Sequence, residues 1–171
     1  MHSDLWGPSP IKTPGHRQYF ASFTDDHTRF THLYLLKLKD ETFEAYKKYD
    51  AWVSTQFNMK IKCLHSDRGG EYTSEEFTRY LASKGTERKL TIHDTPEHNG
   101  VAERLNRTIV KRTRALLHAS GLLKFLWGEA IMHVVWLKNH TLTRALDNKT
   151  PYEMLFKKSQ ILKTYQSGGA E

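Results

Sequence analysis

The sequence has one cysteine among its 171 residues and no long hydrophobic run. A single cysteine, Cys63, excludes an internal disulfide, so we expect an ordinary buried thiol in a reducing compartment. No apolar segment reaches the roughly 20 residues of a transmembrane helix, and the first residues lack the apolar core of a signal peptide. These absences exclude a disulfide scaffold and favour a soluble, intracellular chain.

Acidic residues are also in deficit. The chain has 26 Lys and Arg against 19 Asp and Glu, a formal net charge of +7. This excess favours a polyanionic partner, and the length fits one domain with one core. Ten histidines do not indicate zinc, because His93 and His98 have no cysteine pair at a useful spacing, so we interpret them as scattered surface residues.

Two aromatic and apolar runs, residues 18–24 and 31–38, predict a β-hairpin. Asp25 and Asp26 lie between them. We interpret both as turn residues rather than metal ligands, because Asp side chains bond the local backbone in turns. Residues 60–66 partly alternate in polarity and predict a further strand.

Helical spacing of apolar residues predicts four helices. They span residues 41–57, 74–85, 101–120 and 123–140. Asp40 and Ser74 can cap the first two. The fourth is mostly apolar, so we interpret Trp127 and Trp136 as core residues rather than as platforms on which bases stack.

The helix predicted over residues 101–120 has two distinct sides. At about 100° per residue, one arc that should be buried collects Val101, Ala102, Leu105, Ile109 and Leu116. The opposite side carries Glu103, Arg104, Arg107, Lys111, Arg114 and His118. A solvated helix face is the plain alternative, but so many cations around one acid favour contact with a phosphate backbone. Arg112 falls within the apolar arc, where its side chain would have to snorkel.

Asp67 and Glu103 are separated by 35 residues, and Asp4 supplies a third acid near the N-terminus. Asp67 follows the strand predicted over residues 60–66, and open α/β sheets place their sites at such strand ends. Glu103 opens the long helix. Carboxylates from separated segments can hold two divalent cations about 4 Å apart, which neutralise a phosphodiester and activate the attacking oxygen. The three acids therefore predict metal-dependent phosphoryl transfer on a nucleic acid.

Six motifs, in order along the chain, resemble the successive blocks of one family. They are residues 2–8 (HSDLWGP), 23–29 (FTDDHTR), 64–72 (LHSDRGGEY), 95–108 (TPEHNGVAERLNRT), 125–130 (FLWGEA) and 149–154 (KTPYEM). Together they resemble the integrase catalytic core of copia-type LTR retrotransposons, within the retroviral integrase superfamily. The resemblance covers residues 1–158, and we expect residues 159–171 to form a divergent, flexible tail.

The resemblance implies an α/β, ribonuclease H-like fold, with a mixed five-stranded sheet flanked by helices. It implies that Asp4, Asp67 and Glu103 are both the catalytic residues and the metal ligands, with two Mg²⁺ or Mn²⁺ ions as cofactor. The expected partners are element and target DNA, with RNA as a further candidate, and a homo-oligomer when the core is part of a full integrase. The expected place of action is the nucleus, reached from cytoplasmic particles. The residues expected to contact nucleic acid are Arg104, Arg107, Lys111 and Arg114.

Four further residues are expected to support this site. His65 lies two residues before Asp67, so its side chain should share that face of the strand and could orient a water or a phosphate. Glu71 belongs to the same motif, and we interpret it as supporting rather than as a ligand. Asn99 and Gly100 belong to a turn-rich segment, residues 95–100, which we expect to be a mobile loop that gates the site.

Two features weigh against activity. Only three residues precede Asp4, so its strand should be less firmly paired and the carboxylate less well placed. The tail departs from the family pattern and the residues of an N-terminal zinc module are absent, which favours an excised core or a fragment of an element. Three functions stay open: a polynucleotidyl transferase that joins element 3′ ends to target DNA, an inactive remnant that only binds nucleic acid, and a structural domain. The acids and the cationic helix side argue against the last.

Overall fold

A computed structural model describes residues 1–90 and 100–158 of the chain. Its five strands form one sheet in the order β3-β2-β1-β4-β5. They are β1 (His2–Trp6), β2 (Tyr19–Thr24), β3 (Thr31–Leu36), β4 (Cys63–Ser66) and β5 (Glu87–Leu90). Strand β2 runs antiparallel to both of its neighbours, β1 and β3, whereas β4 is parallel to both β1 and β5. The predicted mixed five-stranded sheet is therefore confirmed.

Strand β1 lies in the centre of the sheet. All five of its residues pair with β2, so that Asp4 stands opposite Ser22. On its other side His2 pairs with His65 of β4, and the Met1 ammonium group donates a hydrogen bond to the carbonyl of Cys63. Asp4 thus lies in the middle of a strand that has neighbouring strands on both sides. Whether the few residues before Asp4 lower the stability of the fold stays a prediction.

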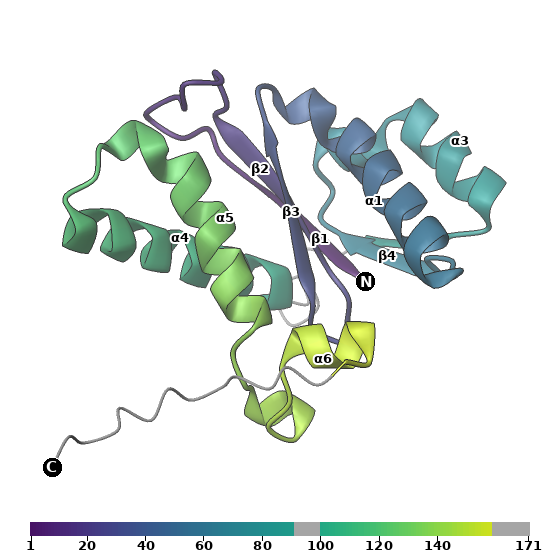
Figure 1. Ribbon diagram of the computed structural model, residues 1–171. Coiled ribbons are helices and arrows are strands. Elements are labelled where there is room, and N and C mark those ends of the chain that lie inside the picture. Colours follow the sequence, from purple (N-terminus) through teal and green to yellow (C-terminus); the bar gives the residue numbers. More distant parts are fainter. Residues whose placement is uncertain (91–99, 159–171) are drawn as a thin grey trace, which may run out of the picture.

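Helices cover both faces of the sheet (Figure 1). The α-helices are α1 (Thr42–Phe57), α2 (Gly70–Thr73), α3 (Glu75–Lys84), α4 (Gly100–Ser120), α5 (Trp127–Asn139) and α6 (Pro151–Phe156). Three short 3-10 helices are η1 (Lys39–Glu41), η2 (Lys124–Leu126) and η3 (Arg144–Leu146). Helices α4 and α5 lie on one side of the sheet and α1 and α3 on the other. In the part of the chain described here, no helix is long and apolar enough to cross a membrane.

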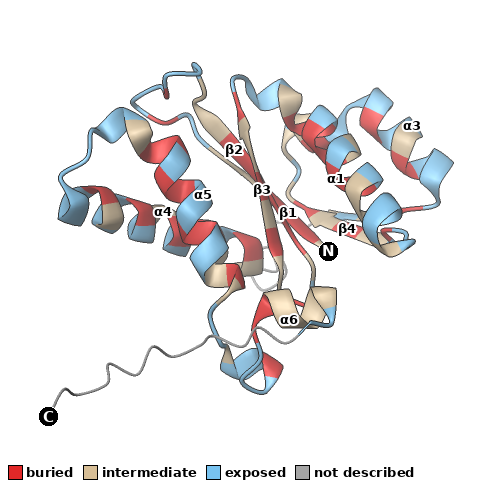
Figure 2. Ribbon diagram, in the orientation of Figure 1, coloured by how far each residue is buried: buried red, intermediate tan, exposed pale blue. Residues whose placement is uncertain are grey.

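Alternation along the strands divides the apolar residues between two cores (Figure 2). Phe23 of β2 packs with Tyr46 and Tyr49 of α1 in the first core. Phe20, on the opposite face of the same strand, packs with the residues of α4 and α5 in the second core. Both cores are built around aromatic rings, and the second one supports the helix that carries Glu103.

The hairpin and the capped helix are confirmed. Strands β2 and β3 pair in register, and the carboxylate of Asp25 accepts hydrogen bonds from the backbone and hydroxyl of Thr28 in the turn between them. Ser74 caps α3 by accepting from the backbone of Phe77, and Gly85 ends that helix with a left-handed backbone. The interpretation of Asp25 as a turn residue is therefore correct.

Two local predictions were wrong, and two elements were not predicted. Asp40 does not cap α1, because a 3-10 turn takes its place and the N-cap position falls on Glu41, whose side chain makes no cap bond. The predicted strand over residues 60–66 begins only at Cys63. Helix α2 and strand β5 were not found from the sequence. The helix is only one turn long, and the strand is a mostly polar edge strand whose residues alternate between exposed and half-buried.

The buried side of α4 differs from the prediction. The helix exists over the predicted residues, but its buried residues are Ala102, Asn106, Ile109, Thr113 and Leu117. This arc is turned by about 70° from the expected one, taking about 100° per residue. Its polar members find partners inside the protein: Asn106 bonds Asp4, and the hydroxyl of Thr113 donates to the carbonyl of Ile109. Arg112 is consequently exposed and has no need to snorkel.

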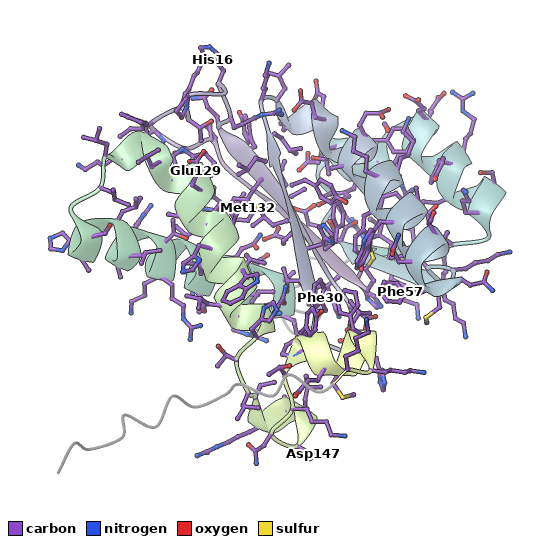
Figure 3. All side chains as sticks on the ribbon, viewed as in Figure 1. His16, Phe30, Phe57, Glu129, Met132 and Asp147 are labelled. Carbon is purple, nitrogen blue, oxygen red and sulfur yellow. The ribbon has the colours of Figure 1, made fainter. Side chains whose placement is uncertain are left out.

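Trp136 was assigned wrongly to the core. Trp127 is buried, as predicted, and its indole N–H donates to the carbonyl of Ile11 at 2.7 Å. Trp136 instead is 53% exposed, because the apolar composition of α5 exceeds what its sheet-facing side can bury. Met132, also exposed on α5, is labelled in Figure 3.

Helix α6 closes the lower end of the sheet in Figure 3. Its N-terminus has a capping box in which the Thr150 hydroxyl and the Glu153 carboxylate each bond the other residue's backbone N–H. The ring of Phe156 then packs edge-on against Phe30 at 5.9 Å and Phe57 at 5.5 Å, measured between ring centroids. The last motif of the family resemblance thus forms an anchored helix.

Asn139, at the end of α5, takes the place of a neighbouring strand along the edge of β3. Its amide oxygen accepts from the backbone N–H of Thr31 at 3.0 Å, and its amide nitrogen donates to the Thr31 carbonyl at 2.8 Å. Both residues are buried. The side chain therefore satisfies two backbone groups that an edge strand would otherwise leave to solvent.

Replacing this amide should destabilise the fold strongly. Asn139→Ala leaves a buried N–H and a buried C=O of Thr31 without partners, so we expect the free energy of unfolding to fall by about 2 kcal/mol or more. Denaturant unfolding followed by circular dichroism measures the change. The exposed Gln56→Ala is the control and should stay within about 0.5 kcal/mol of the wild type. Equal effects of the two substitutions would contradict the role of Asn139.

Candidate active site

The carboxylate of Asp4 lies buried where β1 passes beneath α4. Pairing with β2 fixes its backbone, since the hydroxyl of Ser22 donates to the Asp4 carbonyl at 3.3 Å. Its Oδ2 accepts a hydrogen bond of 2.8 Å from the side-chain amide of Asn106 on α4. The sheet and the helix thus hold this one acid from opposite sides.

Burial raises the pKa of Asp4 from 3.8 to about 6. The hydrogen bond from Asn106 opposes this rise, whereas the negative charges of Asp67 and Glu103 add to it. Such a shift corresponds to roughly 3 kcal/mol between the two protonation states. Asp67 and Glu103 therefore lie near enough to Asp4 for their negative charges to act on it.

Glu103 and Asn106 lie one turn apart on α4 and face the same hollow as Asp4. This hollow has a volume of about 660 Å³. Its lining residues are Asp4, Leu5, Trp6, Glu103, Asn106, Arg107, Val110, Lys111 and Arg114. This arrangement follows from which side of α4 is buried. With the observed buried arc, Glu103 lies at its border and the cationic residues lie beside Glu103.

Asp67 directly follows the last residue of β4 and does not line the hollow. Its Oδ1 accepts a hydrogen bond of 3.0 Å from the backbone N–H of Gly69, which forms the turn into α2. The carboxylate of Glu71 lies over the same glycine, where an added β-carbon would be 2.6 Å from its oxygen. Two acids therefore lie on this turn, and the turn holds Asp67 by its own backbone.

His65 shares a face of the sheet with His2. The two rings stack with centroids 4.7 Å apart, and the Sγ of Cys63 lies 3.5 Å from Nε2 of His65. Burial lowers the pKa of both histidines. His65 thus lies beside His2, which is two residues before Asp4 on β1. The supporting role of His65 in the site stays a prediction.

The four predicted contacts to nucleic acid separate into two groups. Arg107, Lys111 and Arg114 line the hollow. Arg104 does not, because its guanidinium folds back over Gly100, where an added β-carbon would meet its Nη1 at 2.6 Å. Gly100 is the first residue of α4, and Asn99, with the rest of the predicted gating loop, falls outside the described residues.

The residues around Asp4 suit a hard divalent cation by their chemistry. Carboxylate and amide oxygens are the ligands such ions prefer. The Oδ1 of Asn106 is buried in this hollow and has no hydrogen-bond partner in the described part of the chain. Within residues 1–90 and 100–158, however, no three His, Cys, Asp or Glu side chains are grouped closely enough to hold one ion. The donor set therefore fits a metal, while the three carboxylates are spread more widely than a closed coordination sphere requires.

Asn106 is the residue of the candidate site that sequence reasoning missed. It was quoted within a motif, yet its role was not recognised, although it is three residues from Glu103 and so one turn along the helix. A polar residue in the buried arc was the available signal. The apolar residues alone predicted a buried arc that does not contain Asn106, so its position on the buried side of α4 was recognised only in the structure.

Comparison with known proteins identifies the family. Residues 1–96 match the model of the integrase core domain. A retrovirus-related Pol polyprotein from transposon TNT 1-94 of Nicotiana tabacum is 44% identical over 141 residues, which make up 82% of this chain and 11% of that protein. The chain belongs to the integrase core domain family, as its motifs indicated.

Two solved structures share the fold. One is the intasome of simian T-cell lymphotropic virus in complex with the PP2A regulatory subunit B56 gamma, with a TM-score of 0.71 and 18% identity over 94% of this chain and 54% of that one. The other is the HTLV-2 integrase catalytic core domain in complex with magnesium, in a trimeric form, with a TM-score of 0.66 and 17% identity over 90% of this chain and 93% of that one. The predicted ribonuclease H-like fold is confirmed.

The raised pKa of Asp4 predicts a specific pH dependence. Because the folded-state pKa lies above the ordinary 3.8, the stabilising contribution of protonated Asp4 is complete below 3.8 and is lost as the pH rises through about 6. Carboxyl-carbon NMR titration without metal should give a midpoint near 6. Asn106→Leu should raise that midpoint, and Glu103→Gln or Asp67→Asn should lower it, while the exposed Glu75→Gln should leave it unchanged. A wild-type midpoint near 3.8 would refute this electrostatic picture.

Proposed function

We propose that this chain is the catalytic core of an integrase, which joins the 3′ ends of element DNA to target DNA with the help of divalent metal ions. One observation carries the proposal: the buried carboxylate of Asp4 shares a hollow with Glu103 and with three cationic side chains, and the charge of Asp67 acts on it as well. Membership of the integrase core domain family supports the reaction class. The chain spans 11% of the transposon polyprotein it matches, so activity in the setting of a whole protein is part of the proposal.

In the proposed reaction the oxygen of a DNA 3′ hydroxyl attacks the phosphorus of a target phosphodiester. A new P–O bond forms, the bond to the target's own 3′ oxygen breaks, and the proton of the attacking hydroxyl is released. Divalent ions held by Asp4, Asp67 and Glu103 would supply charge neutralisation of the phosphate and activation of the attacking oxygen. Asn106 would keep the Asp4 carboxylate aimed into the hollow.

The cations and apolar residues of the hollow would act on the substrate directly. Arg107, Lys111 and Arg114 follow one side of α4 and would hold a strand by its phosphates, independently of sequence. Trp6 and Val110 would exclude water from one wall. In this proposal the acidic residues act on the reacting phosphate, and the cationic residues hold the neighbouring phosphates of the DNA backbone.

Assembly into a homo-oligomer and action in the nucleus belong to the same proposal. Met132, Trp136 and Leu137 expose apolar surface on α5, and a subunit contact would remove that surface from water. The nucleus is the proposed place of action, because the target of such a reaction is chromosomal DNA.

A remnant that binds DNA without joining it is the second candidate. The spread of the three carboxylates favours it, since the described residues do not gather into a coordination sphere. The cations of the hollow would serve both functions equally. Only catalysis separates the two candidates.

Strand transfer is the decisive measurement. With Mg²⁺ or Mn²⁺ and a branched oligonucleotide that mimics the joined product, the wild type should show strand transfer or its reversal. Asp4→Asn, Asp67→Asn and Glu103→Gln should each abolish it and still bind DNA, because they remove a metal ligand and leave the cations in place. Glu75→Gln is the matched acidic control and should remain active. DNA binding by the wild type with no product in either metal would select the remnant.

Arg107 and Arg112 provide a matched test of the cationic side. Both are exposed arginines of α4, but only Arg107 lines the hollow. Arg107→Gln should weaken binding about equally for different duplex sequences and reduce the slope of log affinity against log salt by about one unit. Arg112→Gln should change neither quantity. If the two variants gave the same slope, the proposed contact with DNA phosphates would be rejected, and these cationic residues would be interpreted as solvated surface.

A further inference from the structure

A second cavity adjoins the hollow, and the reaction proposed above does not use it. It has a volume of about 550 Å³ and opens between α4, the start of α5 and the segment that follows β1. Gly7 turns the chain into that segment with a φ of +138°, and a β-carbon there would lie 2.8 Å from the carbonyl of Gln18. The backbone therefore passes close to β2 and shapes one wall. The cavity volume falls within the range of about 300–1,000 Å³ that is typical of small-molecule sites.

The cavity and the hollow share three lining residues. Trp6, Val110 and Arg114 belong to both. Arg114 is one of the three cationic residues of α4 that would hold the DNA phosphates. A DNA strand bound there would pass the opening of the cavity, because Arg114 also lines the cavity. The two spaces therefore form one continuous surface along α4.

The walls of the cavity are mainly apolar and include two indole rings. Trp6 stacks on Phe20 at 5.3 Å and meets Trp127 edge-on at 6.0 Å, so the core holds both rings in place. Trp127 is fixed further by its hydrogen bond to Ile11. Although Trp127 is a core residue, its ring also lines this cavity, and flat, immobilised aromatic rings are suited to contact with a nucleobase.

The rim of the cavity is cationic. Arg114, His118 and Lys124 supply nitrogen donors, and none of its lining residues is Asp or Glu in the described part of the chain. Leu122 also lines it and is 54% exposed, so an apolar edge borders the opening. An occupant should therefore combine an uncharged flat ring with negative charge, as a nucleotide does.

We propose that this cavity binds the base of one unpaired nucleotide of the DNA strand whose phosphates lie along α4. The proposal rests on the proposed function, because the strand must first occupy the hollow. The base would leave its stack and enter between the apolar walls, while Arg114 and Lys124 contact the adjoining phosphates. Unstacking costs least where a base is already unpaired, so the cavity favours DNA ends or branches over continuous duplex.

Removing single bases tests the proposal. Fluorescence anisotropy measures the affinity for a duplex with a short single-stranded end, in which each unpaired position in turn carries an abasic site. At one position the wild type should lose about fivefold or more in affinity, the loss expected when one stacked base is removed. An equal affinity for all abasic and intact DNAs would overturn the proposal.

Two adjacent leucines provide the matched variants. Leu122 lines the cavity and Leu123, which is 61% exposed, does not. Leu122→Asp places a negative charge at the opening and should abolish the difference between intact and abasic DNA, whereas Leu123→Asp, with the same net charge, should retain it. Leu122→Phe should retain it as well. Circular dichroism checks that all three variants are folded, which is expected because both leucines are exposed.

The outcomes separate this proposal from the proposed function. Strand transfer by the wild type combined with indifference to every abasic site would overturn the base site alone. No binding to any DNA would overturn both. If Leu122→Asp and Leu123→Asp gave the same ratio of affinities, the base site would be rejected, and the cavity would instead suit an apolar segment of a longer protein.

Discussion

Burial of the Asp4 carboxylate beneath α4 is the constraint that shapes this site. A charged carboxylate in the middle of a sheet is costly unless other groups stabilise it. Here one amide hydrogen bond from Asn106 stabilises the charged form, while Asp67 and Glu103 oppose it, and the pKa settles near 6. A divalent cation would relieve the repulsion among the acids.

Helix α4 connects this constraint to everything around it. Its buried arc includes Asn106 and Thr113, two polar residues with partners inside the protein. This choice of arc places Glu103 beside Asp4 and sets Arg107 and Arg114 along the open edge. Acidic and cationic residues therefore occupy adjacent strips of one helix, and the arc that is buried includes the amide of Asn106.

The helix pair α4 and α5 also explains why two spaces adjoin each other. Where α4 lies against β1 the hollow contains the acids, and where α4 lies against the start of α5 the cavity is lined by indole rings. Trp6 belongs to both because it is the last residue of β1. A bound strand could therefore meet polar chemistry and an apolar wall within a short length of the same helix.

The sequence by itself determined the elements whose signals are local. The hairpin of β2 and β3, the Ser74 cap of α3 and the extent of α4 followed from residue types and spacing, since turn chemistry and helical periodicity act between near neighbours. Family motifs placed Asp4, Asp67 and Glu103 together as an expectation and led to the correct fold. The polar edge strand β5 could not be found, because its alternation carries no apolar face.

Only the tertiary structure decided which side of α4 is buried, and with it the role of Asn106. The apolar residues alone predicted an arc about 70° away. Burying an amide is unfavourable unless it has a hydrogen-bond partner, and the partner of Asn106 is Asp4 on β1, which the sequence of the helix does not reveal. The exposure of Trp136 was settled in the same way: the sheet offers α5 one face only, and the remaining apolar residues stay outside. Both questions concern partners distant in sequence, and periodicity within a helix contains no information about what the helix will meet.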